Sequence, residues 1–226
     1  MKLVLFDCDG TIVDSQHMIV AAMDRAIAAN GLPPVPRAAV LGVVGLSLAP
    51  AISRLLPDAD ARVIDAVAEA YKGSFSDLRG RPEHHEPLFP LARETILALA
   101  GEHDTVLGIA TGKSRRGVDA LIEREGFEGL FATIQTADDN PSKPDPGMVL
   151  RAMRETSRAP DRTVMVGDTT FDVEMARAAG VHAIGVSWGY HPVAMLQASG
   201  AHAMIESYAD LPEVIARLVA VMDRAS

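Results

Sequence analysis

The sequence contains a single cysteine, Cys8, among its 226 residues, so no disulfide can form within the chain. It has no uninterrupted apolar run of about 18 residues, the length that a membrane-spanning helix requires. No lipidation motif is found at either end, and no basic, apolar leader precedes the first apolar segment at 3–6. Because a single cysteine cannot form a disulfide within the chain, the sequence is compatible with a reducing compartment. We expect a protein of the cytoplasm that does not insert into a membrane.

Basic residues are in the minority, since 21 Lys and Arg stand against 30 Asp and Glu and give a formal net charge of −9. An acidic surface disfavours nucleic acid and anionic membranes as partners, and we expect neither. Hydrophobic residues make up 48% and charged residues 23%, which is typical of a globular protein. Because the surface is acidic overall, an anionic substrate would need local positive charge from a metal ion, a lysine or backbone N–H groups.

Two carboxylates, Asp7 and Asp9, directly follow the apolar residues 3–6. The apolar run indicates a buried parallel strand, and ligands bind at the carboxyl ends of such strands. Aspartate is rare in strands, and two neighbouring carboxylates repel each other unless a cation or a function holds them together. We therefore expect Asp7 and Asp9 to share one site.

The C-terminal part of the chain alternates between strand and helix patterns, which predicts right-handed βαβ units around a parallel sheet. Expected strands cover 105–110, 131–135, 163–166, 181–186 and 203–205, and expected helices cover 114–125, 146–156, 171–179 and 211–224.

The segment that follows the first strand has helical patterns and no convincing strand. Its expected helices cover 16–30, 47–56 and 59–78. We therefore predict an α/β fold with a Rossmann-like, three-layer parallel-sheet core and an inserted helical cap. The catalytic core would comprise 1–14 and 85–226, and the cap domain 15–84.

Two further segments carry groups suited to an anion. Thr111 and Gly112 follow the expected strand at 105–110 and open a helix, where a hydroxyl and free N–H groups can bind an anion. Lys143 lies in a turn between prolines, which restrict the backbone and hold the lysine in place. Taken singly, each segment is also compatible with an ordinary helix cap or a solvated charge.

A second pair of carboxylates, Asp168 and Asp172, follows the expected strand at 163–166. Four residues apart, they would lie one helical turn from each other if the helix has begun. Helix capping by Asp168 is the simpler explanation, and both interpretations can hold together.

In chain order the four segments read D-x-D-G-T, T-G, K-P and G-D-x-x-x-D, which closely resembles the four signature motifs of the haloacid dehalogenase superfamily. The resemblance covers nearly the whole chain. It implies that Asp7 attacks phosphorus and forms an aspartyl-phosphate, and that Asp9 protonates the leaving oxygen and later activates water. It also implies that Thr111 and Lys143 hold the transferring phosphoryl group, beside Gly10 and Gly112.

The resemblance further implies a Mg²⁺ cofactor. Its ligands would be Asp7, the backbone carbonyl of Asp9, and Asp168, with Asp172 supporting the metal directly or through water. Mg²⁺ prefers oxygen ligands, so a cluster of carboxylates is suited to it.

Asp9 favours phosphate-ester chemistry, because the dehalogenase and phosphonate-cleaving branches lack an aspartate there. The helical insert resembles the phosphoglycolate phosphatase-like branch, so a small phosphorylated metabolite is the expected partner and phosphoglycolate the leading substrate. In the insert, Ser47, Arg54 and Lys72 are candidate contacts to the leaving group, and Arg54 would suit a carboxylate. A phosphosugar mutase of the β-phosphoglucomutase type and a non-catalytic binding or regulatory module remain alternatives. Either a monomer or a homodimer is expected.

Overall fold

The computed structural model describes residues 1–79, 81 and 85–223. Within these residues, six strands form one sheet in the order β3-β2-β1-β4-β5-β6, and every neighbouring pair is parallel. The strand order reverses between β1 and β4, and in open α/β sheets ligands bind at such a reversal. The strands are β1 (Lys2–Phe6), β2 (Thr105–Ala110), β3 (Phe131–Gln135), β4 (Thr163–Gly167), β5 (His182–Val186) and β6 (Ala203–Ile205).

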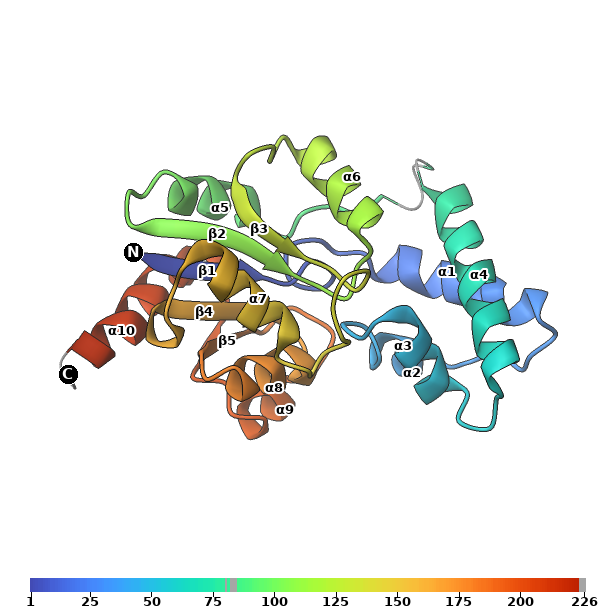
Figure 1. Ribbon diagram of the computed structural model, residues 1–226. Helices are drawn as coiled ribbons and strands as arrows, with labels where there is room; N and C mark the ends of the chain where they lie inside the picture. Colours follow the sequence, from blue (N-terminus) through green and yellow to red (C-terminus); the bar gives the residue numbers. More distant parts are fainter. Residues whose placement is uncertain (80, 82–84, 224–226) are drawn as a thin grey trace.

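Helices cover both faces of the sheet (Figure 1). On one face are α5 (Ala92–Ala100), α6 (Arg115–Glu125) and α10 (Leu211–Asp223), and on the other are α7 (Gly147–Thr156), α8 (Thr170–Ala178) and α9 (Val193–Ala198). Two short 3₁₀ turns, η2 (Pro160–Arg162) and η3 (Tyr208–Asp210), connect these elements.

Strand β1 shows why the sheet is buried on both faces. Its side chains alternate, so that Val4 and Phe6 pack into one hydrophobic cluster and Leu3 and Leu5 into the other. Cys8 continues the first set and is fully buried. Burial also raises the pKa of the Cys8 thiol, which leaves it a packing residue rather than a nucleophile.

Of the helices described between β1 and β2, the first four form a separate layer at the right of Figure 1, far from the two chain termini. We call residues 16–78 the helical insert. Its helices are α1 (Gln16–Ala29), α2 (Arg37–Leu41), α3 (Leu48–Leu55) and α4 (Ala61–Leu78). They enclose a hydrophobic cluster of their own that includes Ile27, Ile52 and Val67.

The chain leaves the sheet layer at Val13 and returns to it at Leu88, and these two residues form an antiparallel bridge. The backbone N–H of Asp14 donates to the carbonyl of Pro87 at 2.9 Å. The two crossings therefore lie side by side. The predicted domain boundary at 84/85 involves a residue outside the described ones, and the division into two domains stays a prediction.

The predicted α/β fold with a helical insert is confirmed, and the strands at 105–110, 131–135 and 203–205 have the expected bounds. Three helices were not predicted, namely α2, α5 and α9. Helices α2 and α9 have five and six residues, so their apolar periodicity extends over too few turns to stand out. Helix α5 begins without a capping side chain.

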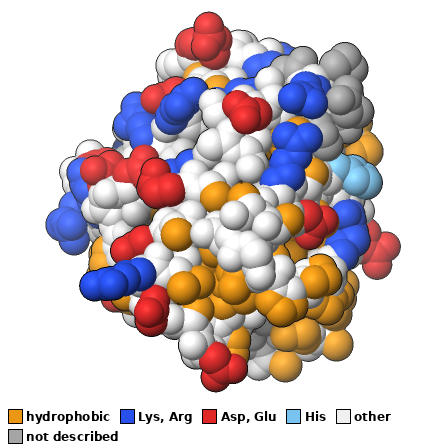
Figure 2. Space-filling model, turned by 90° about the vertical axis from the view of Figure 1, so that its right-hand side faces the viewer, with side chains coloured by type: hydrophobic (Ala, Val, Ile, Leu, Met, Phe, Trp, Pro, Cys, Tyr) orange, Lys and Arg blue, Asp and Glu red, His pale blue; other side chains and the backbone are white. Residues whose placement is uncertain are grey.

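Of the helices described, none combines the length and apolar character needed to cross a membrane. The end of the molecule formed by the insert carries hydrophobic side chains gathered in one area and charged side chains of both signs around them (Figure 2).

Candidate active site

Three carboxylates meet at the carboxyl ends of β1 and β4. Asp7 directly follows β1, Asp168 directly follows β4, and Asp172 lies in the first turn of α8. Because β1 and β4 are neighbours, ligand oxygens of all three lie within 4.8 Å of one another, and all three residues are buried. The expected convergence of these residues is therefore present in the structure.

Asp168 is held in one orientation by two hydrogen bonds. Thr11 Oγ1 donates to its Oδ1 at 2.8 Å, and the backbone N–H of Tyr190 donates to its Oδ2 at 2.9 Å. The backbone also approaches it closely at Gly10, where φ is +85° and an added Cβ would lie 2.3 Å from Asp168 Oδ2. A side chain at Gly10 would thus occupy the space of the carboxylate.

Asp172 is anchored by the start of α8. Its Oδ2 accepts from Thr169 Oγ1 at 2.7 Å and from the Thr169 backbone N–H at 3.0 Å, which completes a capping box. Its Oδ1 pairs with Lys143 Nζ at 2.5 Å. The N-cap of α8 is therefore Thr169, whereas the sequence had suggested Asp168 for capping.

Asp7 is the carboxylate with unused binding capacity. Lys143 Nζ lies 2.9 Å from its Oδ1, yet neither oxygen accepts a well-oriented hydrogen bond from the described residues. A buried carboxylate normally has its oxygens satisfied. Unsatisfied oxygens on Asp7, beside two further buried carboxylates, are a donor set that fits a hard divalent cation such as Mg²⁺.

In the cluster, buried negative charge exceeds buried positive charge. Burial, with a contribution from the Asp172 carboxylate, raises the pKa of Asp7 to about 6 against the opposing effect of Lys143. Burial and the carboxylates of Asp172 and Asp7 raise the pKa of Asp168 well above its usual range. Although burial lowers the pKa of Lys143, the two carboxylates that it contacts raise it above its ordinary value. Lys143 is thus a buried, charged ammonium.

Replacing Lys143 with Met is expected to destabilise the metal-free protein by about 3–5 kcal/mol, because it leaves buried carboxylates without their cation. Urea unfolding monitored in EDTA measures this loss. Lys72→Met is the matched control, since Lys72 forms only an exposed pair with Glu69 at 2.7 Å and such a pair contributes roughly 0.5 kcal/mol. Equal effects of the two substitutions would show that Lys143 does not stabilise the cluster.

The pKa of Asp7 makes the stability of the metal-free protein depend on pH. In the folded protein Asp7 keeps its proton up to about pH 6, whereas the ordinary pKa of an aspartate is 3.8. Below about pH 4 both states are protonated, so Asp7 contributes no penalty, and stability is lost as the pH rises through this interval. In EDTA, the unfolding free energy of the wild type should fall relative to that of Asp7→Asn by roughly 1–3 kcal/mol between pH 4 and 7. Parallel pH curves for the two proteins would refute this prediction.

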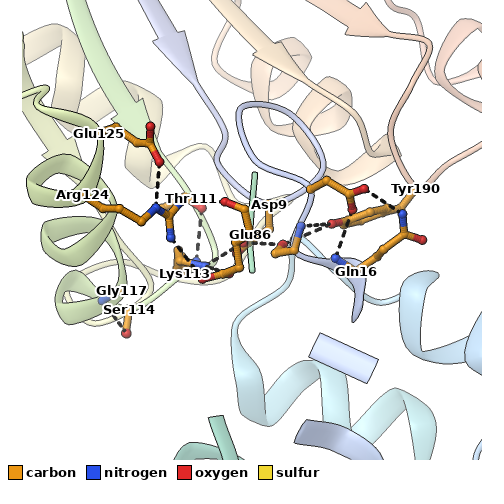
Figure 3. Close-up of polar contacts among 12 residues, drawn as sticks. Asp9, Gln16, Glu86, Thr111, Lys113, Ser114, Gly117, Arg124, Glu125 and Tyr190 are labelled. Carbon is orange, nitrogen blue, oxygen red and sulfur yellow. Dashed lines mark hydrogen bonds and ion pairs between the residues drawn. The ribbon is translucent and has the colours of Figure 1, made fainter. Parts of the chain in front are cut away.

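Asp9 lies in a different environment from the three clustered carboxylates. Its Oδ1 accepts from Lys113 Nζ and from Ser15 Oγ, both at 2.7 Å, and its side chain is 13% exposed (Figure 3). Lys113 also lies 3.5 Å from Glu86 Oε1. Tyr190 Oη is 3.1 Å from Ser15 Oγ and extends the chain of contacts. This network holds the Asp9 carboxylate in place, and Asp9 lines the same cavity as Asp7.

Thr111 and Gly112 lie at the end of β2, beside β1. Thr111 is buried, and its Oγ1 accepts from the Lys113 backbone N–H at 3.2 Å. Gly112 packs tightly against the helical insert, because an added Cβ would lie 2.6 Å from the carbonyl oxygen of Gly45. Thr111, Gly112, Asp7 and Asp9 all line one cavity of about 600 Å³ between the sheet and the insert.

The three candidates in the insert are placed differently. Lys72 lines the cavity and forms an exposed pair with Glu69 at 2.7 Å. Ser47 lines the cavity, its backbone N–H donates to Ser142 Oγ at 2.9 Å, and its own buried hydroxyl has no partner among the described residues. Arg54 does not line the cavity, since it is exposed and its guanidinium lies over the Phe171 ring, 5.0 Å from the centroid. The structure thus brings Ser47 to the site but not Arg54.

Three residues of the site were not among those predicted. Lys113 and Ser15 contact Asp9, and Tyr190 contacts Asp168 and Ser15. Lys113 follows Thr111 and Gly112 directly, so the position of that motif was a usable signal. Tyr190 follows the strand at 181–186, a position compatible with the entrance of the site or with packing on the core or cap, but nothing in the sequence indicated that it contacts Asp168 and Ser15.

The sequence and the fold are similar to those of known proteins. The family model described as haloacid dehalogenase-like hydrolase covers residues 4–186. A protein of Dickeya dadantii (strain 3937) named probable phosphatase IndB is 36% identical over 213 residues, which are 92% of this chain and 91% of that protein. A phosphoglycolate phosphatase of Pseudomonas putida is 33% identical over 193 residues, 84% of this chain and 71% of that protein. The crystal structure of a hydrolase from Pseudomonas syringae has a TM-score of 0.85 at 23% identity and covers 96% of this chain and 99% of that one.

The chain therefore belongs to the haloacid dehalogenase-like hydrolase family. The family expected from the four motifs is confirmed. The expected class of enzyme, a hydrolase of phosphoric monoesters, is confirmed by the same relatives, which are named phosphatases.

Proposed function

We propose that this protein is a Mg²⁺-dependent phosphatase that hydrolyses a small phosphomonoester through an aspartyl-phosphate at Asp7. The observation that carries the proposal is Asp7 itself: a buried carboxylate with unsatisfied oxygens that is paired with Lys143, belongs to a cluster of three acids and lines a cavity. Phosphoglycolate is the candidate substrate that the names of several relatives suggest.

In the first step an Asp7 oxygen attacks phosphorus and the bond from phosphorus to the ester oxygen breaks. The Asp9 carboxylic acid donates a proton to that leaving oxygen. In the second step the Asp9 carboxylate accepts a proton from water, whose oxygen attacks phosphorus and releases Asp7. Lys143 and Thr111 hold the phosphoryl oxygens, and catalysis consists mainly of positioning and charge neutralisation.

Asp7, Asp168 and the backbone carbonyl of Asp9 are the groups that would hold Mg²⁺, with Asp172 beside them. When bound, the ion neutralises charge and lets an anionic carboxylate and an anionic phosphate approach each other. Lys143 cannot replace it, since Lys143 is a single charge already shared by Asp7 and Asp172.

We propose that the partner is a small phosphorylated metabolite and that the protein acts in the cytoplasm. We propose neither nucleic acid nor a membrane surface as a partner. The net charge of −9 supports this choice, because both alternatives are polyanions. Whether the protein acts as a monomer or a homodimer, each chain carries the complete set of site residues described above.

The experiment is a measurement of phosphate release from a panel of esters that includes phosphoglycolate, glycerol phosphate and hexose phosphates. We expect release with Mg²⁺ and none with excess EDTA. Release that is unaffected by EDTA would contradict the metal requirement. Absence of release from every ester would contradict the phosphatase and favour a binding or regulatory module.

A phosphosugar mutase is distinguished by the fate of the phosphoryl group. A phosphatase releases it to water in every turnover, whereas a mutase returns it to the sugar. Conversion of a hexose phosphate into its positional isomer with no free phosphate, after addition of a hexose bisphosphate primer, would favour the mutase.

A further inference from the structure

The cavity above Asp7 and Asp9 is larger than a small hydroxy acid requires. It measures about 600 Å³, which corresponds to roughly 20 water molecules at about 30 Å³ each. Its floor is formed by Asp7, Asp9 and Thr111, so the phosphoryl group is expected to lie there. The remainder of the cavity faces the helical insert and is available to the leaving group.

The walls that the insert contributes are mainly apolar. They come from α1, from the stretch 40–51 that runs from the end of α2 through the first half of α3, and from the C-terminal half of α4. Chief among them are Ile19, Met23, Val43, Val44, Tyr71 and Phe75. Ile19 and Met23 also belong to the hydrophobic cluster of the insert, so this wall is continuous with a packed core and is pre-formed.

Two positive charges along the cavity are paired with acids, Lys113 in a half-buried to buried setting and Lys72 in an exposed pair. Lys113 is paired with Asp9 and lies 3.5 Å from Glu86, and its ammonium is 5.4 Å from the Phe75 ring centroid. Lys72 pairs with Glu69. A carboxylate close to the phosphate would have to compete with these acids for a cation, and a poorly paired charge in an apolar site costs free energy.

The two arginines of the lining, Arg79 and Arg116, each contact a side chain of α4. Arg116 Nη2 lies 3.5 Å from Ser76 Oγ, and the Arg79 guanidinium is 5.6 Å from the Phe75 ring centroid. Arg54, the arginine that the sequence suggested for a substrate carboxylate, is outside the lining. These two arginine contacts are with an uncharged hydroxyl and an aromatic ring, whereas the cavity surface that faces the insert is mainly apolar.

From this combination we infer that the preferred substrates are phosphomonoesters whose leaving group has an uncharged, apolar body, such as a branched-chain or aromatic alcohol, rather than glycolate. The inference rests on the proposed phosphatase function and adds the class of leaving group. The phosphate binds at the Asp7 floor, and the apolar body packs against the insert between Val44 and Phe75.

A series of alkyl phosphates tests the inference on the wild-type enzyme with Mg²⁺. Ethyl, butyl, hexyl and 2-phenylethyl phosphate have leaving groups of similar basicity, so differences report binding in the cavity. We expect kcat/KM to rise by about fourfold per buried methylene, and 2-phenylethyl phosphate to exceed phosphoglycolate by at least about tenfold. A flat series, or phosphoglycolate as the best ester, would overturn the inference while leaving the phosphatase intact. No Mg²⁺-dependent release from any ester would instead contradict the proposed function.

Two variants assign the effect to the cavity wall. Phe75→Ala removes an aromatic wall, and Val44→Thr changes polarity at nearly constant volume. Both should reduce the ratio of kcat/KM for 2-phenylethyl over ethyl phosphate, Phe75→Ala by about tenfold. Leu97→Ala, on α5 and 44% exposed, is the matched control and should leave the ratio unchanged.

Binding without turnover gives a second readout. Titration calorimetry with 2-phenylethylphosphonate should show tighter binding than with ethylphosphonate to the wild type and a smaller difference for Val44→Thr. Should Phe75→Ala fail to fold, the wild-type series and Val44→Thr still decide the outcome. Equal affinities of the two phosphonates for the wild type would contradict the inference.

Discussion

Replacing Asp7 with Asn is expected to lower phosphate release by about 10⁴-fold or more while the protein remains folded. An amide has no negative oxygen to attack phosphorus, so the covalent route is closed. The fold should tolerate the change because Asp7 is one of three buried carboxylates whose mutual repulsion the substitution reduces. Phosphate release and the thermal unfolding midpoint, measured on the same samples, check both parts.

The matched control is Asp104→Asn. Asp104 precedes β2 at the opposite end of the sheet from the site, where it forms an exposed pair with Lys2 at 3.4 Å. Its substitution should leave kcat and KM unchanged. If Asp7→Asn retained a substantial part of the wild-type rate, Asp7 would not be the nucleophile and another residue of the cavity would have to be.

Replacing Asp9 with Asn is expected to reduce kcat for alkyl phosphates by about 10²–10⁴-fold, the range typical of a lost general acid–base. The effect should depend on the leaving group. A nitrophenolate leaves without a proton, so transfer from nitrophenyl phosphate to Asp7 should continue while hydrolysis of the aspartyl-phosphate slows. A rapid burst of nitrophenol followed by a slow steady rate is the measurement that shows this.

The contacts of Asp9 allow a sharper test of its role. Lys113→Met removes the 2.7 Å ion pair with Asp9 but keeps the Asp9 carboxyl group. It should lower kcat less than Asp9→Asn does, because the acid and base remain in place but are less well positioned. If Asp9→Asn slowed the first transfer to Asp7 equally for alkyl and nitrophenyl phosphates, proton donation by Asp9 to the leaving oxygen would be contradicted.

Much of the fold could be predicted because the sheet is buried on both faces. Strand β2 is a run of apolar and small residues ending at a polar motif, and it was predicted with its observed bounds. In α6, Ser114 caps the start and Gly126 ends the helix with φ +63°, signals that local sequence carries. The short helix α2 lacks both an extended apolar stripe and a capping side chain, so it escaped prediction.

The clustered acids of the site could be predicted because each one directly follows a strand or begins the next helix. Parallel strands bring their carboxyl ends to one edge, which places Asp7 beside Asp168 although 160 residues separate them in the chain. The contacts of Tyr190 and the position of Arg54 depend on how loops and the insert pack on the sheet. Such packing is set by side chains far apart in sequence, and Arg54 accordingly lies over Phe171 rather than in the cavity.

The covalent intermediate gives the most direct test of the account. Asp9→Asn enzyme is mixed with nitrophenyl phosphate and Mg²⁺, quenched in acid within the burst, and digested for peptide mass spectrometry. The account predicts one added phosphoryl group on the N-terminal peptide, located at Asp7 and absent from the Asp7→Asn, Asp9→Asn double variant. Release of nitrophenol with no phosphorylated peptide, or with the phosphoryl group on another residue, would contradict it.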